Sequence, residues 1–247
     1  MIARHEPKVL ILASRTKSKI EEVAATIAEQ SPSVKTKQVE LDFGSIAATR
    51  RAATQIAGLV DHIDIIIHSA AVNSSERRET QDGLESQFGV NYIGPFLLTS
   101  LLTSQLKAAA AKSPTPGLTR VINVSSLGYR LSPIRFHDYN FEGKPVPQEE
   151  EPPKSVPDYM RPVPHEGRAY HGFCAYGQSK TANILDAVWL NERLGADGIR
   201  AFALHPGCMS FDLTSKVGSA NGGFYSNLDR AAKVSLRGRL PDAEKHQ

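Results

Sequence analysis

Hydrophobic and polar positions along this chain repeat with two different periods. Apolar side chains at Ile20, Val23, Ala24 and Ile27 have the spacing of a helix that buries one face. Between such helical stretches lie short apolar runs rich in β-branched residues, at 8–13, 63–67, 119–124 and 199–204. Strands that alternate with helices are typical of an α/β fold built on a parallel sheet.

Two of the predicted strands stop abruptly at residues that suit a binding site. The run 119–124 leads into Ser125, Ser126 and Gly128, and the run 199–204 leads into His205-Pro-Gly207. Ligands of open α/β sheets bind at the carboxyl ends of the strands. We therefore expect the functional site at these strand ends.

The segment Tyr176-Gly-Gln-Ser-Lys180 carries the clearest chemical signal. In a helix, residues four apart lie on one face, so the phenol and the ammonium are neighbours. A neighbouring ammonium stabilises the phenolate and lowers the tyrosine pKa from roughly 10. Such a tyrosine can exchange a proton with a carbonyl or an alcohol. The alternative is an exposed helix pair, because this spacing is common by chance.

A further helical pattern at 90–98 contains Asn91 and is interrupted by Gly94 and Pro95. Proline lacks a backbone N–H and kinks a helix, so we expect freed backbone groups near Asn91.

Together these motifs resemble the short-chain dehydrogenase/reductase family, from about Lys8 to about Leu213. The sequence from Tyr176 to Asn183 is similar to that of the family branch that contains retinol dehydrogenases, protochlorophyllide reductase and the oxidoreductase domain of WW-domain proteins. The resemblance implies a Rossmann-type, doubly wound parallel sheet. It also implies an NADP(H)-dependent oxidoreductase that interconverts a carbonyl and an alcohol on a small, lipophilic substrate.

The resemblance also implies four catalytic residues. Tyr176 would be the general acid/base, and Lys180 would lower its pKa and hold the nicotinamide ribose. Ser126 would hydrogen-bond the substrate oxygen, and Asn91 would position a water in the proton relay.

For the cofactor, the resemblance assigns Arg15, Asp42, Ser69 and Met209, together with Tyr176 and Lys180. A cation at Arg15 favours the 2′-phosphate of NADP; the alternative is a surface arginine at a helix start. Asp42 would lie near the adenine; the alternative is a strand-end aspartate, with Ser45 as the better N-cap. Two positions depart from the family pattern, because Ala71 replaces a glycine and Phe211 replaces a threonine.

The family's opening strand and glycine-rich phosphate loop have no counterpart, since no glycine precedes Gly44. In the family that strand lies between the second and fourth strands. No closing strand is legible after Leu213. We therefore expect residues 1–247 to form a single, incomplete NADP-binding domain that is truncated at both ends.

A proline-rich insertion at about 131–172 separates Ser126 from Tyr176. We expect a long loop with little regular structure. One hypothesis is that this loop is a lid over the substrate, with Tyr139, Phe141, Tyr159 and Tyr170 as candidate apolar contacts. The alternative is a flexible surface loop that makes no contact with the substrate.

Composition narrows the function classes. A net charge of +3 over 247 residues, with scattered basic residues, does not indicate nucleic-acid binding. Two cysteines make no disulfide framework, no metal-ligand spacing occurs, and no membrane span is legible, so a cytoplasmic location is expected. A histidine at 68 without an acidic or nucleophilic neighbour predicts a structural role.

Two partner hypotheses remain open. The apolar stripe with Trp189 on the helix that begins near Tyr176 is either core or the surface of a homodimer. A catalytically inactive, truncated homologue that acts as an interaction module is the alternative to the enzyme.

Overall fold

The computed structural model describes residues 2–162 and 170–207. Within them the chain divides into two compact units. One contains 2–12, 18–38 and 206–207, and the other contains 13–17 and 39–205. The single-domain organisation over residues 1–247 stays a prediction.

The first unit is built from four elements: η1 (Ile2–His5), β1 (Val9–Ser14), α1 (Lys17–Gln30) and β2 (Lys35–Glu40). Strands β1 and β2 are neighbours in a two-stranded sheet. The helical period read from the sequence is confirmed, because Ile20, Ala24 and Ile27 are the buried residues of α1. Ile27 packs with Ala3 and Val34 in a small core.

The second unit holds the remaining elements. They are α2 (Ile46–Leu59), β3 (Ile65–His68), α3 (Ser86–Phe88), the π-helical turn η2 (Gly89–Ile93), α4 (Gly94–Leu101), α5 (Thr103–Lys112), β4 (Thr119–Val124), η3 (Leu127–Leu131), η4 (Gln148–Glu150), η5 (Asp158–Met160), α6 (Gly172–Leu194) and β5 (Ile199–Leu204).

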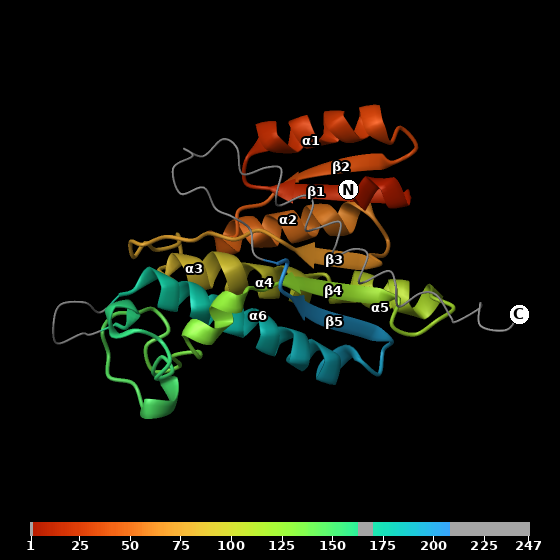
Figure 1. The fold of residues 1–247 in the computed structure, drawn as a ribbon. Coiled ribbons are helices and arrows are strands. Elements are labelled where there is room, and N and C mark those ends of the chain that lie inside the picture. Colours follow the sequence, from red (N-terminus) through yellow and green to blue (C-terminus); the bar gives the residue numbers. More distant parts are fainter. Residues whose placement is uncertain (1, 163–169, 208–247) are drawn as a thin grey trace, which may run out of the picture. The chain divides into compact units, whose positions relative to one another are not determined.

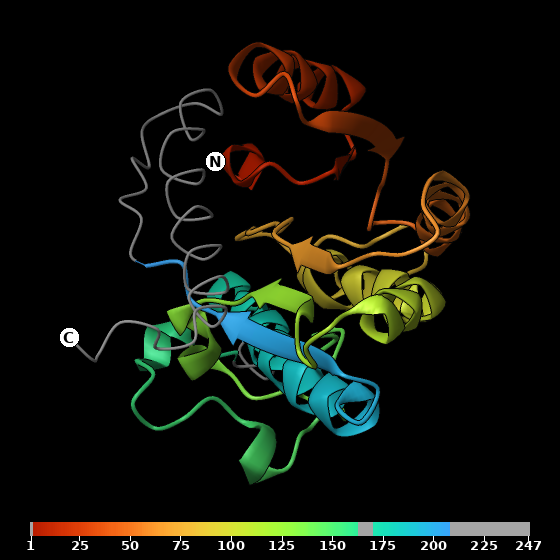
Figure 2. The same ribbon diagram turned by 90° about the vertical axis from the view of Figure 1, so that its right-hand side faces the viewer.

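The centre of this unit is a parallel sheet in the order β3-β4-β5 (Figure 1). Every residue of β4 is buried, as expected for the middle strand of a parallel sheet. Helices α5 and α6 lie along one face of the sheet, where Leu106 and Leu190 pack against Val121 and Ile199 (Figure 2). The three carboxyl strand ends therefore share one edge.

The strands form two separate sheets, one of β1 and β2 and one of β3, β4 and β5. The parallel strands and crossover helices confirm a Rossmann-type α/β fold.

The described part of the proline-rich segment contains only short 3-10 turns, η4 and η5, as expected. It is anchored by Phe141, which is 1% exposed and packs with Cys174 and Ala175. The Asp138 carboxylate accepts hydrogen bonds from the N–H groups of Glu142 (2.7 Å) and Gly143 (3.2 Å) beside it. The expectation that Phe141 would face substrate is therefore wrong: its side chain is core.

None of the helices in the described ranges combines the length and the apolarity that crossing a bilayer requires.

Candidate active site

Helix α6 carries Tyr176 and Lys180 on one face, as their spacing predicts. The ammonium nitrogen of Lys180 lies 5.4 Å from the centre of the Tyr176 ring. The Ser179 hydroxyl donates to the Tyr176 carbonyl at 2.7 Å within the same turn. The pair is therefore not an exposed helix pair, since Lys180 is only 2% exposed.

The Lys180 ammonium is held at the end of β4. Its nitrogen donates to the carbonyl oxygen of Val124 at 2.9 Å, and the Ser125 hydroxyl donates to the Lys180 carbonyl at 2.9 Å. Burial disfavours the charged form and lowers the lysine pKa to about 8. A lysine in this state can change protonation near neutral pH.

Ser126 lies two residues after the end of β4, near the tyrosine. Its oxygen accepts a hydrogen bond from the N–H of Gly128 at 3.2 Å, which caps η3. The Ser126 side chain is also close enough to the Tyr176 phenol to lower the pKa of that phenol. Gly128 leaves the space for this contact, because a Cβ there would lie 3.0 Å from the ring carbon Cδ1 of Tyr176. The structure thus brings Ser126, Tyr176 and Lys180 together.

The pKa of Tyr176 differs from the expectation drawn from the spacing. Burial raises it, and the hydrogen bond from Ser126 lowers it by less, so the net pKa lies above the usual value of 10.0. The ammonium of Lys180 donates to the Val124 carbonyl and lies near the Tyr176 ring. Desolvation therefore outweighs the stabilisation of the phenolate.

Asn91 lies in the π-helical turn η2, 2% exposed. Pro95 follows four residues later and cannot donate to the Asn91 carbonyl, which explains the irregular turn at the predicted kink. The Asn91 side chain binds the main chain of Val72. Its Oδ1 accepts a hydrogen bond from the Val72 N–H at 2.7 Å, and its Nδ2 donates to the Val72 carbonyl at 3.0 Å. Nδ2 also donates to the Ser179 hydroxyl at 3.0 Å, which links Asn91 to α6.

Arg15 and Asp42 follow β1 and β2, and the two chain segments are joined because the N–H of Leu41 donates to the Ser14 carbonyl at 3.0 Å. Arg15 is exposed. The Asp42 carboxylate accepts from the N–H of Gly44 at 2.8 Å. Ser45 caps α2, as predicted, through a hydrogen bond from the N–H of Ala48 at 3.3 Å.

At the end of β3, His68 is buried, whereas the residues that follow it are more exposed. His68 is buried, its Nε2 lies 2.7 Å from the Thr99 hydroxyl, and burial lowers its pKa to about 4, which confirms the structural role. Ser69 is half-buried and Ala71 is exposed just beyond it. Met209 and Phe211 lie outside the described residues.

Sequence reasoning missed Glu85 and Gln87. Gln87 lies four residues before Asn91 and is completely buried, and its Nε2 donates to Ser74, Tyr170 and Gly172. The only available signal was its helical register with Asn91. Tyr170, one of the candidate apolar contacts under the lid hypothesis, donates to the Glu85 carboxylate at 3.1 Å. The lid hypothesis stays a prediction.

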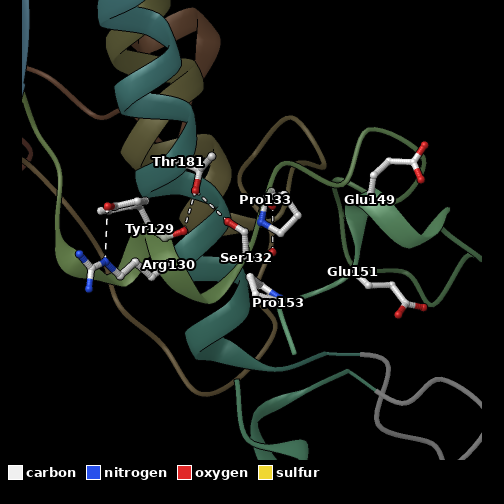
Figure 3. Close-up of a pocket in the computed structure, with 8 residues that line it drawn as sticks. All are labelled: Tyr129, Arg130, Ser132, Pro133, Glu149, Glu151, Pro153 and Thr181. Atoms are coloured by element: carbon white, nitrogen blue, oxygen red, sulfur yellow. Dashed lines mark hydrogen bonds between the residues drawn. The ribbon is translucent and has the colours of Figure 1, made fainter. Parts of the chain in front are cut away.

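A cavity of about 450 Å³ lies between η3 and the proline-rich segment (Figure 3). Thr181 lines it and donates to the carbonyls of Tyr129 and Ser132 at 3.0 and 2.7 Å. The glutamates Glu149 and Glu151 lie on its opposite side. None of the residues that line it is Ser126, Tyr176 or Lys180, so this cavity is distinct from the acid/base group.

Comparison with known proteins decides the family. The profile described as short chain dehydrogenase matches residues 1–140. The chain belongs to the short-chain dehydrogenase family. Among curated members of this family, the oxidoreductase fscI of Fusarium equiseti is 33% identical over 207 residues, which are 83% of this chain and 79% of that protein. Retinol dehydrogenase 13 of Mus musculus is 33% identical over 215 residues.

The matched region covers 87% of this chain but 55% of that mouse protein, so the chain spans about half the length of the retinol dehydrogenases it matches. Among solved structures, an uncharacterized protein from Mycobacterium Paratuberculosis is 27% identical, with a TM-score of 0.62 over 98% of this chain and 70% of its own. The NADPH-bound carbonyl reductase from chicken fatty liver has a TM-score of 0.60 at 18% identity, over 92% of this chain and 80% of its own, and shows the fold alone.

The buried ammonium yields a prediction about stability. The folded pKa of Lys180 is about 8 against an ordinary 10.5, so between these pH values the unfolded chain binds more protons and stability rises with pH. Below pH 8 the charged lysine destabilises the fold. We expect Lys180→Met to raise the free energy of unfolding at pH 7 by on the order of 1–3 kcal/mol, measured by urea denaturation.

The gain should shrink as the pH approaches 10. The exposed Lys154 provides the control, because Lys154→Met should leave stability within about 0.5 kcal/mol at both pH values. A Lys180→Met variant that is less stable than the wild type at pH 7 would contradict the argument.

Proposed function

We propose that this chain is an NADP(H)-dependent oxidoreductase that interconverts a carbonyl and an alcohol. The observation that carries the proposal is the contact of the Ser126 hydroxyl with the Tyr176 phenol, beside the buried ammonium of Lys180. A phenol so placed can transfer a proton, and a hydroxyl beside it can hydrogen-bond the same substrate oxygen.

A bound nicotinamide supplies the hydride, and the chain's own groups handle the oxygen. Tyr176 donates the proton to the substrate oxygen in reduction and accepts it in oxidation. Ser126 polarises the carbonyl, and Lys180 has its ammonium near the ring and is available to the nicotinamide ribose. Asn91, whose carbonyl receives no hydrogen bond from Pro95, supports the water of the relay.

The raised pKa of Tyr176 keeps the phenol protonated at neutral pH, which is the form that donates a proton in carbonyl reduction. Oxidation of an alcohol would use the phenolate form of the same residue.

Proposed cofactor contacts are Arg15, Asp42, Ser69 and Met209, with Tyr176 and Lys180. The donor set fits the two ends of NADP: an exposed guanidinium suits the 2′-phosphate, and the buried ammonium suits the ribose hydroxyls. The sequence supplies no glycine-rich turn for the pyrophosphate. NADPH in the chicken carbonyl reductase and NADP in other relatives of the same fold support the choice of cofactor.

A small lipophilic carbonyl compound is the proposed substrate, by analogy with the names of the retinol dehydrogenases. The cytoplasmic location read from the sequence stays a prediction. The alternative, a non-catalytic interaction module, gains no support from the comparisons, in which the named relatives are an oxidoreductase and retinol dehydrogenases.

Tyr176→Phe tests the acid/base role. It removes the proton donor and keeps the ring, so kcat for NADPH-dependent reduction of a hydrophobic ketone should fall about 10²- to 10⁴-fold. The matched control is Tyr129→Phe on η3, which should keep wild-type kcat; equal activity in both variants would rule out the assignment of Tyr176.

Arg15→Ala tests the choice of cofactor. Loss of one charge-assisted phosphate contact should weaken NADPH binding by about ten- to a hundredfold and leave NADH binding unchanged, as read from thermal melts with each nucleotide. Arg50→Ala, an exposed arginine of α2, is the control. A wild-type melt that responds equally to both nucleotides, or to neither, would overturn the proposal for NADP.

We also propose a homodimer through α4 and α6. Leu185, Val188 and Trp189 are 49%, 50% and 40% exposed on α6, and the Trp189 ring lies 5.6 Å from that of Phe96 on α4. Such a contiguous apolar face favours a protein partner. Leu194, at the end of α6, is buried.

Val188→Asp should convert the dimer into monomers in sedimentation velocity, because a buried unpaired carboxylate is costly at an interface. Phe136→Asp, at an aromatic residue that is 69% exposed elsewhere in the second unit, is the control and should leave the mass unchanged. A monomeric wild type at micromolar concentration would exclude this interface.

A further inference from the structure

Two side-chain amides, one helical turn apart, hold the segment after β3 by its main chain. Asn91 binds both the N–H and the carbonyl of Val72, at 2.7 and 3.0 Å. Gln87 does the same for Ser74: its Oε1 accepts from the N–H at 3.4 Å, and its Nε2 donates to the carbonyl at 3.1 Å. The two amides thus grip alternate residues, as a neighbouring strand would.

The same two amides also reach α6. Nδ2 of Asn91 donates to the Ser179 hydroxyl, and Nε2 of Gln87 donates to the Gly172 carbonyl, both at 3.0 Å. Residues 172 and 179 are about two helical turns apart, and residue 176 lies between them on the same face. The two contacts therefore bracket Tyr176.

Near Gln87, the first turn of α6 and the segment after β3 are in contact through their main chains. Gly172 approaches the segment after β3 so closely that a Cβ would lie 2.2 Å from the Ser74 carbonyl oxygen. Gln87 bonds both of these residues, so it fixes the first turn of α6 against a segment that β3 positions.

Gln87 is itself held in place. Its side chain is completely buried, and its Nε2 donates to the Tyr170 hydroxyl at 2.8 Å. That hydroxyl donates to the Glu85 carboxylate at 3.1 Å. Glu85, also completely buried, accepts from the N–H groups of Gln87 and Phe88 at 3.0 and 2.8 Å. These contacts restrict the Gln87 side chain to one orientation.

We propose that Gln87 is a positioning residue for Tyr176, which it places by locking the first turn of α6 to the segment after β3. The inference rests on the proposed function, since it names a residue that acts through the proposed general acid. Gln87 touches neither Tyr176 nor Ser126; it acts through Gly172 and Ser74.

Gln87→Met tests the proposal, because methionine has a similar shape and no donor. The matched control is Gln178→Met. Gln178 is also completely buried, but it binds the Arg135 N–H and the Tyr139 carbonyl, both at 2.9 Å, in the proline-rich segment. Both variants lose a buried side-chain amide, but only Gln87→Met loses the hydrogen bonds to Ser74.

We expect kcat for NADPH-dependent ketone reduction to fall about ten- to a hundredfold in Gln87→Met, with the KM for substrate within about threefold. Gln178→Met should keep kcat within about threefold. Tyr170→Phe is a second, milder variant in case Gln87→Met does not fold. It removes the hydrogen bonds of the Tyr170 hydroxyl to Gln87 and to Glu85, and should lower kcat about three- to tenfold. Equal kcat losses in Gln87→Met and Gln178→Met, or unchanged kcat in a folded Gln87→Met or Tyr170→Phe, would overturn the proposal.

Two measurements do not depend on turnover. In Gln87→Met, and not in Gln178→Met, amide hydrogen exchange at Ser74 should accelerate at least about tenfold. The Tyr176 titration, followed by ¹³C NMR of labelled tyrosine and assigned with Tyr176→Phe, should move upward as the Ser126 contact loosens. If the wild type reduces no carbonyl, the proposed function fails, and these two measurements alone decide the positioning role.

Discussion

The close approach of α6 to the segment after β4 is the constraint on which the rest of the site depends. A Cβ on Gly177 would lie 2.7 Å from the Gly128 carbonyl oxygen, and one on Gly128 would meet the Tyr176 ring. Helix and segment therefore touch by main chain. Only at this distance can a serine, with its short side chain, reach the phenol while a lysine on the same helix reaches the end of β4.

This approach forces a charge into the protein, and the charge has opposite consequences for folding and chemistry. Lys180 loses nearly all its solvent and gains the carbonyl of Val124, which does not restore its ordinary pKa. The fold therefore carries an unfavourable interaction at neutral pH. Perturbed groups of this kind concentrate at functional sites because catalysis needs them there. Burial acts on Tyr176 in the same way and keeps its proton in place.

Many of the helices and strands around the site could be predicted from the sequence, because they depend on local patterns of apolar and polar residues. The strand at Ile199–Leu204 and the buried face of α1 agree with their periodicity, and the break at Gly94 and Pro95 became the π-helical turn that holds Asn91. The direction of the Tyr176 pKa could not be read, because burial depends on contacts distant in sequence. Phe141 was misread for the same reason: a proline-rich composition does not reveal which aromatic residue anchors it.

The contacts of Gln87 could not be predicted from the sequence. A glutamine in a helix has no signature, and its partner at Gly172 lies 85 positions away. The register with Asn91 becomes informative only when both amides are seen on alternate residues of one segment. Polar groups buried this deeply must be satisfied, so each such amide reports which main-chain segments the fold holds together.

The residues proposed for acid/base chemistry and those proposed for cofactor binding depend on different parts of the chain. Asn91, Ser126, Tyr176 and Lys180 are fixed by hydrogen bonds within the second unit, and none of these bonds uses β1 or β2. Arg15 and Asp42 instead follow β1 and β2, whose first residues belong to the other unit. Arg15 and Asp42 therefore bear on the proposed binding of the dinucleotide, whereas the surroundings of Tyr176 are set by the packing of α6 on β4 and η3.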